Sequence, residues 1–192
     1  MRAPISVVIP TLNAAEGLGP TLASLAEGLA EGLIAELILS DGGSEDAIAE
    51  VAEAVGARLV SGPAGRGGQL ARGAAAARGA WLLFLHADTR LPAGWSAAAR
   101  AHLESAARRP EGAAGRAAVF RLAFDDESLA ARWVAGWANL RTRVFALPYG
   151  DQGLLISRAL YDAVDGYPDQ PLMEDVAIAR RLGRGGIALL PL

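Results

Sequence analysis

Two observations predict an α/β protein built on a mostly parallel central sheet flanked by helices. Over the first ninety residues, short apolar runs alternate with segments whose apolar residues recur at helical spacing. This rhythm of strand and helix indicates βαβ units with right-handed crossovers. Polar motifs directly follow two of the runs, and open parallel sheets bind ligands at that edge.

The first half of the chain is expected to hold four strands and three helices. The strands are predicted at residues 5–9, 37–40, 58–60 and 81–85. The first helix carries Leu18, Leu22 and Leu25, with Asn13 as its expected cap. Asp46 opens the second helix, and a glycine-rich loop over 62–68 leads into the third helix at 69–78.

The second half departs from this regular alternation. The expected elements are a helix over 94–108, an alternating strand-like segment over 117–124, an amphipathic helix over 128–144, a strand at 154–157, helices at 158–164 and 173–183, and a closing strand at 187–190. A loop with the sequence Gly-Asp-Gln-Gly precedes the strand at 154–157. No linker or repeat divides the chain, so one domain over 1–192 is expected.

Composition excludes several classes of protein. The 192 residues are 52% hydrophobic and carry a net charge of −3, which disfavours a nucleic-acid binder. Without cysteine there is no disulfide, thiolate metal site or cysteine nucleophile. The chain has no apolar run of the roughly 18 residues needed to span a membrane, and its start leaves no room for a signal peptide. A cytoplasmic protein is expected, and a peripheral membrane contact near Trp133 and Trp137 remains open.

The chemistry centres on two motifs that follow predicted strands. The first is Ser40-Asp41-Gly42-Gly43-Ser44-Glu45-Asp46, and the second is His86-Ala87-Asp88-Thr89. Carboxylates at the ends of adjacent parallel strands converge, so they can read a nucleotide base and hold a divalent cation against a diphosphate. Asp41 is equally explained as a turn residue, and Asp88 and His86 have an alternative as a turn cap and a hydrogen-bonded strand-end histidine.

Two further features carry weaker signals. Arg66, in the glycine-rich loop, could meet a phosphate or a base edge. Glu174 and Asp175 open a helix, where favourable interaction with its dipole explains both charges. A carboxylate at this place could also remove a proton from an acceptor hydroxyl.

Taken in order, these motifs resemble family 2 of the inverting glycosyltransferases, which have the two-lobed GT-A fold with a Rossmann-like sheet. Residues 5–13 resemble the opening strand and turn of the family, and residues 40–46 resemble its Asp-Asp-Gly-Ser-x-Asp motif. Residues 85–88 resemble the Asp-x-Asp metal motif, and Glu174-Asp175 with Arg180-Arg181 resembles the segment near the catalytic base. The resemblance covers nearly the whole chain.

The resemblance implies transfer of a sugar from a nucleoside-diphosphate donor, a UDP-sugar in preference, to an acceptor hydroxyl with inversion. Residues 1–90 form the nucleotide-sugar-binding half, and 91–192 form the acceptor and catalytic half, with an acceptor lobe over 113–149. The implied sites are nucleotide contacts at Pro10, Thr11, Asn13, Asp41, Arg66 and Ala87, a Mn²⁺ or Mg²⁺ site at Asp88 and His86, sugar or acceptor contacts at Asp151 and Gln152, and a base at Asp175 with Glu174 as second choice.

The chain departs from the family pattern at two positions. Gly42 stands where a second Asp is usual, and His86 replaces the first Asp of the metal motif. His86 either ligates the metal, which favours manganese, or orients a phosphate. The Leu-His-Ala-Asp-Thr string is similar to a small bacterial subgroup, some of whose members are grouped with arsenosugar synthesis.

Two other functions stay open from the sequence. A nucleotidyltransferase would use similar metal chemistry, although it normally has a Gly-rich, basic loop where this chain has Pro10-Thr11-Leu12-Asn13. A non-catalytic nucleotide-sugar-binding protein would fit the changes at Gly42 and His86. A homodimer is compatible with either reading.

Overall fold

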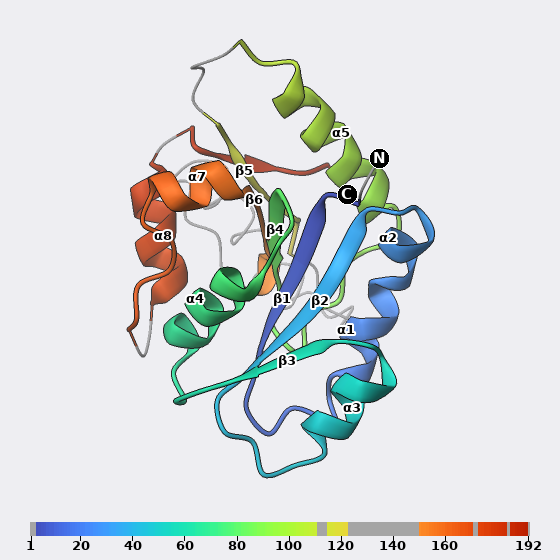
Figure 1. Cartoon of the computed structure of the whole chain (residues 1–192). Coiled ribbons are helices and arrows are strands. Elements are labelled where there is room, and N and C mark those ends of the chain that lie inside the picture. Colours follow the sequence, from blue (N-terminus) through green and yellow to red (C-terminus); the bar gives the residue numbers. More distant parts are fainter. Residues whose placement is uncertain (1–2, 111–114, 123–149, 171–172, 184, 192) are drawn as a thin grey trace, which may run out of the picture.

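A seven-stranded sheet forms the middle layer of the molecule (Figure 1). The computed structural model describes residues 3–110, 115–122, 150–170, 173–183 and 185–191. The strand order is β3-β2-β1-β4-β6-β5-β7, and β6 runs antiparallel to both of its neighbours. The strands are β1 (Ile5–Thr11), β2 (Ile34–Asp41), β3 (Arg58–Ser61), β4 (Trp81–Phe84), β5 (Ala117–Val119), β6 (Leu154–Ser157) and β7 (Ile187–Leu189).

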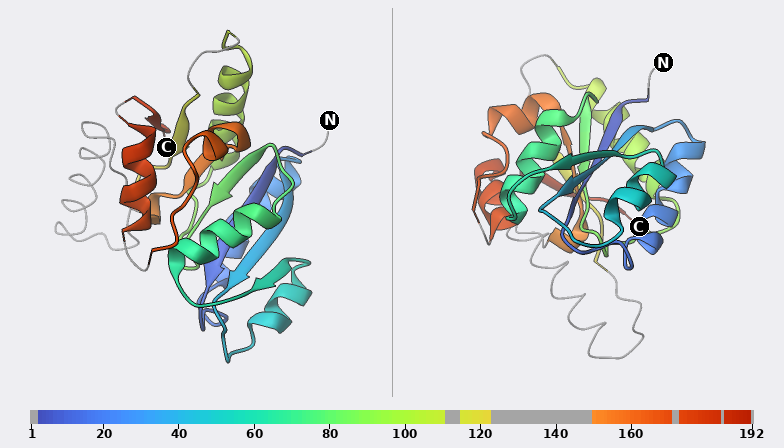
Figure 2. Two further views of the ribbon diagram at one scale, coloured as in Figure 1. Left: turned by 60° about the vertical axis from the view of Figure 1, so that its left-hand side comes forward. Right: turned by 60° about the horizontal axis from the view of Figure 1, so that its bottom comes forward.

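Helices cover both faces of this sheet (Figures 1 and 2). One face carries α1 (Gly19–Ser24), α2 (Ala26–Ala30), α3 (Ile48–Ala54) and α5 (Trp95–Ala107). The other carries α4 (Arg66–Ala76), α7 (Arg158–Ala163) and α8 (Glu174–Leu182). A short 3₁₀ helix, η1 (Gly150–Gln152), precedes β6. The α/β fold with a mostly parallel sheet is therefore confirmed.

Strand alternation divides the apolar side chains between two cores. Ile5, Val7 and Ile9 of β1 point into the first core, where the fully buried Trp95 packs against them from α5. Val8 points into the second core, beneath α4. Gly73 lets α4 approach this closely, because a Cβ there would lie 2.3 Å from Val8 Cγ1.

Three details differ from the sequence expectation. Residues 66–68, expected in a loop, form the first turn of α4, since glycine at 67 and 68 permits a close approach to the segment 168–170. Asn13 is not a helix cap: it has φ +50°, and α1 begins only at Gly19. β2 begins at Ile34, three residues before its expected start, because it pairs with β1 from Ile5 onward.

Part of the second half lies outside the described residues. This holds for the helix expected over 128–144, with Trp133 and Trp137, and for most of the expected acceptor lobe over 113–149. Within the described part of the chain, no helix has both the length and the apolar character needed to cross a membrane.

Candidate active site

Topology brings four chain segments to one edge of the sheet. The parallel strands β1, β2 and β4 end there; the two polar motifs follow β2 and β4, and a loop with the expected nucleotide contact Asn13 follows β1. Because β6 is antiparallel, its start lies beside the end of β4, with Leu154 paired to Phe84. The residues just before β6 therefore reach the same edge, and this places Asp151 next to His86.

The loops after β1 and β2 are fastened to each other by side-chain hydrogen bonds. The backbone N–H of Asn13 donates to Ser44 Oγ (2.8 Å), and that of Ala15 donates to Asp46 Oδ2 (2.7 Å). In return, the N–H of Glu45 donates to Asn13 Oδ1 (2.9 Å). The side chain of Asn13, an expected nucleotide contact, thus holds the second loop.

Asp41 is buried at the end of β2, and its carboxylate already accepts four hydrogen bonds. Oδ2 accepts from the backbone N–H groups of Gly43 (2.8 Å) and Ser44 (2.9 Å), and Oδ1 accepts from the hydroxyls of Thr11 and Ser44. Burial by itself would raise the pKa of Asp41, but the bonds from Ser44, Gly43 and Thr11 outweigh it and lower that pKa. In this conformation the carboxylate therefore stabilises the loop after β2.

Gln69, which the sequence analysis did not single out, joins α4 to the same edge. Its buried amide donates to the carbonyls of Thr11 (2.7 Å) and Ser40 (2.9 Å). This contact also accounts for Gly42: a Cβ at position 42 would lie 3.1 Å from the Gln69 amide and 3.2 Å from Ala64 Cα. The aspartate usual in the resembling motif would be crowded here, and Gln69 or the backbone at Ala64 would have to shift by a few tenths of an ångström.

Two clefts open on this edge and share a wall. The first has a volume of about 820 Å³ and is lined by eight of the expected site residues: Pro10, Thr11, Asn13, Arg66, His86, Ala87, Asp88 and Asp151. The second has a volume of about 610 Å³, and its lining includes Thr89, Phe120 and Gln152. Asp88 and Asp151 belong to both clefts, so the carboxylates stand at their junction.

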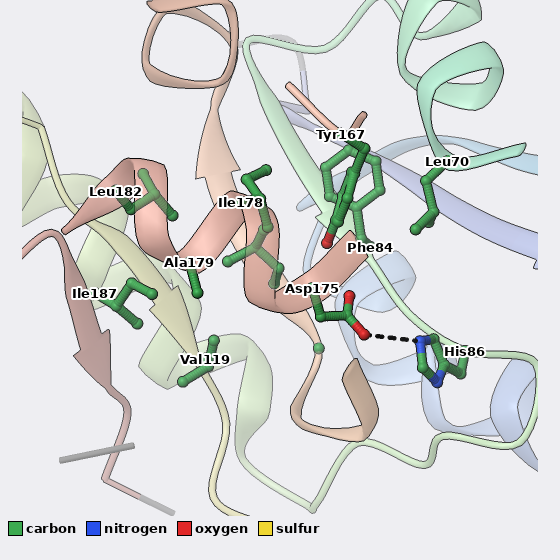
Figure 3. Close-up of a pocket in the computed structure, with 12 residues that line it drawn as sticks. Leu70, Phe84, His86, Val119, Tyr167, Asp175, Ile178, Ala179, Leu182 and Ile187 are labelled. Carbon is green, nitrogen blue, oxygen red and sulfur yellow. Dashed lines mark ion pairs between the residues drawn. The ribbon is translucent and has the colours of Figure 1, made fainter. Parts of the chain in front are cut away.

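His86 lies between two carboxylates. Its Nδ1 is 3.0 Å from Asp151 Oδ1, and its Nε2 is 3.9 Å from Asp175 Oδ2, as Figure 3 shows for the second pair. The hydrogen bond from His86 is the main cause that lowers the pKa of Asp151. The imidazole therefore connects the shared wall of the clefts with the start of α8.

The same residues form a group able to hold a metal ion. His86, Asp88 and Asp151 each offer one ligand atom, and these atoms lie within 4.8 Å of one another. A second such group combines His86 with Glu174 and Asp175. The first group fits a divalent cation better, because both of its carboxylates are exposed at the clefts, whereas Glu174 is buried beside the Arg66 guanidinium. One imidazole and two carboxylates suit manganese or magnesium.

Asp175 lies in the first turn of α8 and is mostly shielded from solvent. Burial raises its pKa above the ordinary value. The interactions with His86 and Arg66 oppose this shift, while the carboxylates of Glu174 and Asp151 add to it. Asp175 lines neither of the two clefts; it lines a small, mainly apolar pocket beside His86. A shielded carboxylate with a raised pKa has the character of a general base.

Glu174 lies deeper than Asp175. Its Oε1 is 3.7 Å from Arg66 Nε, close enough for an ion pair, and has no hydrogen-bond partner among the described residues. Glu174 is only 2% exposed, so an acceptor hydroxyl would not reach it in this conformation. The pair links the first turn of α8 to the first turn of α4.

Gln152 also has a partner within the protein. Its side chain is buried, and Nε2 donates to the carbonyl oxygen of Phe120 (3.0 Å), whose N–H donates to the Gln152 carbonyl (2.9 Å). The sugar or acceptor contact expected of Gln152 stays a prediction.

Comparisons with known proteins bear on the family and the fold. The family described as glycosyl transferase family 2 matches residues 6–132. Among solved structures, a fragment of S. aureus TarS (residues 1–349) is 16% identical, with a TM-score of 0.71 over 97% of this chain and 58% of that one. The same fragment has been solved in complex with UDP-GlcNAc. No curated protein matches the chain.

A second group of similar structures is the glucosyl-3-phosphoglycerate synthase of Mycobacterium tuberculosis. In its complex with Mn²⁺, UDP and glucosyl-3-phosphoglycerate, the enzyme chain has 24% sequence identity to this chain. The TM-score is 0.65, over 97% of this chain and 68% of that one. Both likenesses show the GT-A fold. Since the family match covers more than half of the sequence, the chain belongs to glycosyl transferase family 2.

Proposed function

We propose that this glycosyltransferase moves a sugar from a nucleoside-diphosphate donor, a UDP-sugar in preference, to an acceptor hydroxyl with inversion at the anomeric carbon. One observation carries the proposal. His86 joins Asp151, at the junction of the two clefts, to Asp175, a shielded carboxylate whose pKa is raised. Solved structures of similar fold that contain UDP-GlcNAc, or UDP with Mn²⁺, support a UDP-sugar donor.

The first cleft is the proposed donor site. Its volume of about 820 Å³ is in the range of small-molecule sites. The loop after β1, which hydrogen bonds from the loop after β2 hold in place, lines this cleft, and so does the half-exposed Arg66. A guanidinium there can pair with phosphate oxygens through its Nη groups while Nε faces Glu174.

The proposed metal ligands are His86, Asp88 and Asp151, whose ligand atoms lie close enough together to share one ion. A bound Mn²⁺ or Mg²⁺ would neutralise charge that develops on the departing diphosphate. His86 gives the site an imidazole ligand, which manganese accepts more readily than magnesium does. Its other ring nitrogen remains directed at Asp175.

Asp175 is the proposed base, and the second cleft is the proposed acceptor site. One carboxylate oxygen takes the proton from the acceptor hydroxyl as that oxygen attacks the anomeric carbon. The new carbon–oxygen bond forms on the face opposite the breaking bond, and the electron pair of that bond leaves with the nucleoside diphosphate. The raised pKa of Asp175 is closer to neutral pH than that of an ordinary aspartate. General-base catalysis is most efficient when the pKa of the base is near the operating pH.

The first experiment is a calorimetric titration of UDP, GDP, TDP and CDP, with and without Mn²⁺. We expect metal-dependent binding of UDP to the wild type and its loss in Asp88→Asn. The matched control is Asp162→Asn, which removes the same charge from an exposed position on α7. The absence of binding by any nucleotide would contradict the proposal.

Transfer itself is then measured with a panel of UDP-sugars and hydroxyl acceptors. We expect Asp175→Asn to bind UDP as the wild type does and to transfer no sugar. Full activity in this variant would remove Asp175 from the role of base. Binding without transfer in the wild type, under any metal, would support the non-catalytic alternative instead.

A further inference from the structure

We infer that Tyr167 is a positioning residue for the catalytic carboxylate, because its buried hydroxyl lies on the side of the Asp175 oxygen that does not face His86. This inference rests on the proposed function, since it needs Asp175 to act as the base. It concerns a residue outside all the motifs that the sequence analysis identified. Its role would be to hold Asp175 in one orientation toward the acceptor.

Tyr167 is fixed by its surroundings. It follows α7 in the chain, is 6% exposed, and packs edge-on against Phe84 with ring centroids 4.9 Å apart. Its backbone N–H donates to the hydroxyl of Tyr161 (3.1 Å). Gly166, with φ +54°, turns the chain directly against the Tyr161 ring, where a Cβ would come within 2.5 Å. Backbone and ring of Tyr167 are therefore both held.

The hydroxyl of Tyr167 has one described partner that matters for the reaction. It hydrogen-bonds to the side chain of Asp175, and burial together with that carboxylate raises the pKa of Tyr167 well above its ordinary value. The phenol thus stays protonated and can only donate to an ionised Asp175. In Figure 3, one Asp175 oxygen is directed at His86, and the other lies on the side of the Tyr167 hydroxyl.

Packing of the Tyr167 ring does not require its hydroxyl group. The pocket around it is lined mainly by apolar side chains, including Leu70, Phe84 and Ile178, which a phenylalanine ring would contact equally well. Burying a hydroxyl among such groups is unfavourable unless it has a hydrogen-bond partner, and Asp175 supplies one. Two contacts on different carboxylate oxygens, from Tyr167 and from His86, then restrict the rotation of the carboxylate.

The segment that carries Tyr167 is also tied to the donor-binding helix. A Cβ at Gly67, in the first turn of α4, would lie 2.2 Å from the carbonyl oxygen of Pro168. The backbone next to Tyr167 is therefore packed directly on the turn that presents Arg66. Relaxation of Tyr167 away from Asp175 is blocked from this side.

The contact is tested without any assay of activity by a double-mutant cycle in unfolding. Tyr167→Phe, Asp175→Ala and the double variant are compared with the wild type by urea denaturation. A hydrogen bond to a charged group predicts that the unfolding equilibrium constants depart from additivity by about tenfold or more. Additivity within about twofold would overturn the contact.

The positioning role is tested by the kinetics of Tyr167→Phe. We expect kcat to fall by about tenfold or more, while the donor KM and the Kd for UDP change by less than about twofold, because only the orientation of the base is lost. Tyr161→Phe is the matched control: it removes a hydroxyl from the same aromatic group, but one that bonds the backbone of Tyr167 rather than Asp175. The Tyr161→Phe variant should have a lower melting temperature than the wild type and should retain most of the wild-type kcat.

The outcomes separate the inference from the proposed function. Wild-type kcat in Tyr167→Phe, or equal losses of kcat in both tyrosine variants, would overturn the positioning role. A third outcome is non-additivity in the unfolding cycle together with no sugar transfer by the wild type. This result would overturn both the proposed function and the positioning role, and only the hydrogen bond between Tyr167 and Asp175 would stand.

Discussion

The Asp41→Asn substitution should destabilise the fold, because the carboxylate of Asp41 is an acceptor for four groups of the site loops. The amide oxygen of Asn can still accept from the N–H groups of Gly43 and Ser44. Its NH₂ group would face the hydroxyls of Thr11 and Ser44, which would have to turn and accept. The variant keeps the shape of the site and loses the charge on the acceptor.

The size of the effect follows from these contacts. A hydrogen bond to a charged group contributes about 1.5–3 kcal/mol, against about 0.5–1.5 kcal/mol for a neutral pair, so each backbone bond loses about 1 kcal/mol. Two such bonds and the turned hydroxyls together predict a loss of about 2–3 kcal/mol. For a protein of this length, that corresponds to a fall in Tm of roughly 4–12 °C.

The measurement is thermal and urea unfolding without nucleotide at pH 7. Asp88→Asn is the matched control, since Asp88 is exposed and its side chain makes no hydrogen bond within the described part of the chain. A Tm for Asp41→Asn equal to that of this control, combined with loss of UDP binding, would refute the reasoning. That result would show that Asp41 contacts the base directly, as the motif in the sequence implies.

The pH dependence gives a second check on the same variant. Because the pKa of Asp41 is lowered on folding, its charge stabilises the fold above the ordinary pKa of 3.8, and this stabilisation is lost as the pH falls through the folded pKa. The difference in stability between the wild type and Asp41→Asn should therefore be constant near neutral pH and shrink below about pH 4. A difference that grows on acidification would contradict the assignment.

Three further predictions concern the contacts around α4 and α8. Glu174→Gln should raise the donor KM several-fold, roughly three- to tenfold, with little change in kcat, because Arg66 loses the charge that holds it; steady-state kinetics at saturating acceptor would show this. Gly67→Ala should lower Tm despite its better helix propensity, since the added methyl meets Pro168 O, whereas Gly19→Ala, with open space around it, should leave Tm unchanged or higher. In the dependence of kcat on pH, the loss of activity on the acid side should have its midpoint above the ordinary aspartate pKa of 3.8, because burial raises the pKa of Asp175 and its base form is lost as the pH falls. A midpoint at or below 3.8 would contradict the assignment of Asp175 as the base.

The parallel part of the fold could be predicted from the sequence because its signals are local. Each strand from β1 to β4 is a short apolar run next to a helical segment, so the alternation could be read along the chain. The antiparallel β6 could not be oriented in this way. Its direction is set by pairing with β4, more than seventy residues earlier, and a run such as Leu154–Ser157 carries no sign of direction.

In the site, too, the sequence predicted the features that follow directly from local patterns and not those that depend on tertiary packing. Motifs that directly follow a strand, such as the one with Asp88, could be placed at the ligand-binding edge from the topology alone. The proximity of Asp151 to His86 depends on β6, and that of Tyr167 to Asp175 depends on packing between α7, α8 and β4. Gln69 was missed because a polar residue in a helix is usually solvent-exposed, whereas this one is buried against two carbonyl groups.

The hydrogen bonds that fasten the loops after β1 and β2 bear on the thermodynamics of nucleotide binding. Ordering one free residue costs roughly 1–2 kcal/mol of backbone entropy, and a cleft wall built from a loose loop after β1 would impose that cost on every binding event. Here Asn13, Ser44 and Asp46 hold the wall in place through contacts within the protein itself. The conformational entropy of this wall is lost once, during folding, so the free energy of each nucleotide contact is available for affinity and for discrimination between bases.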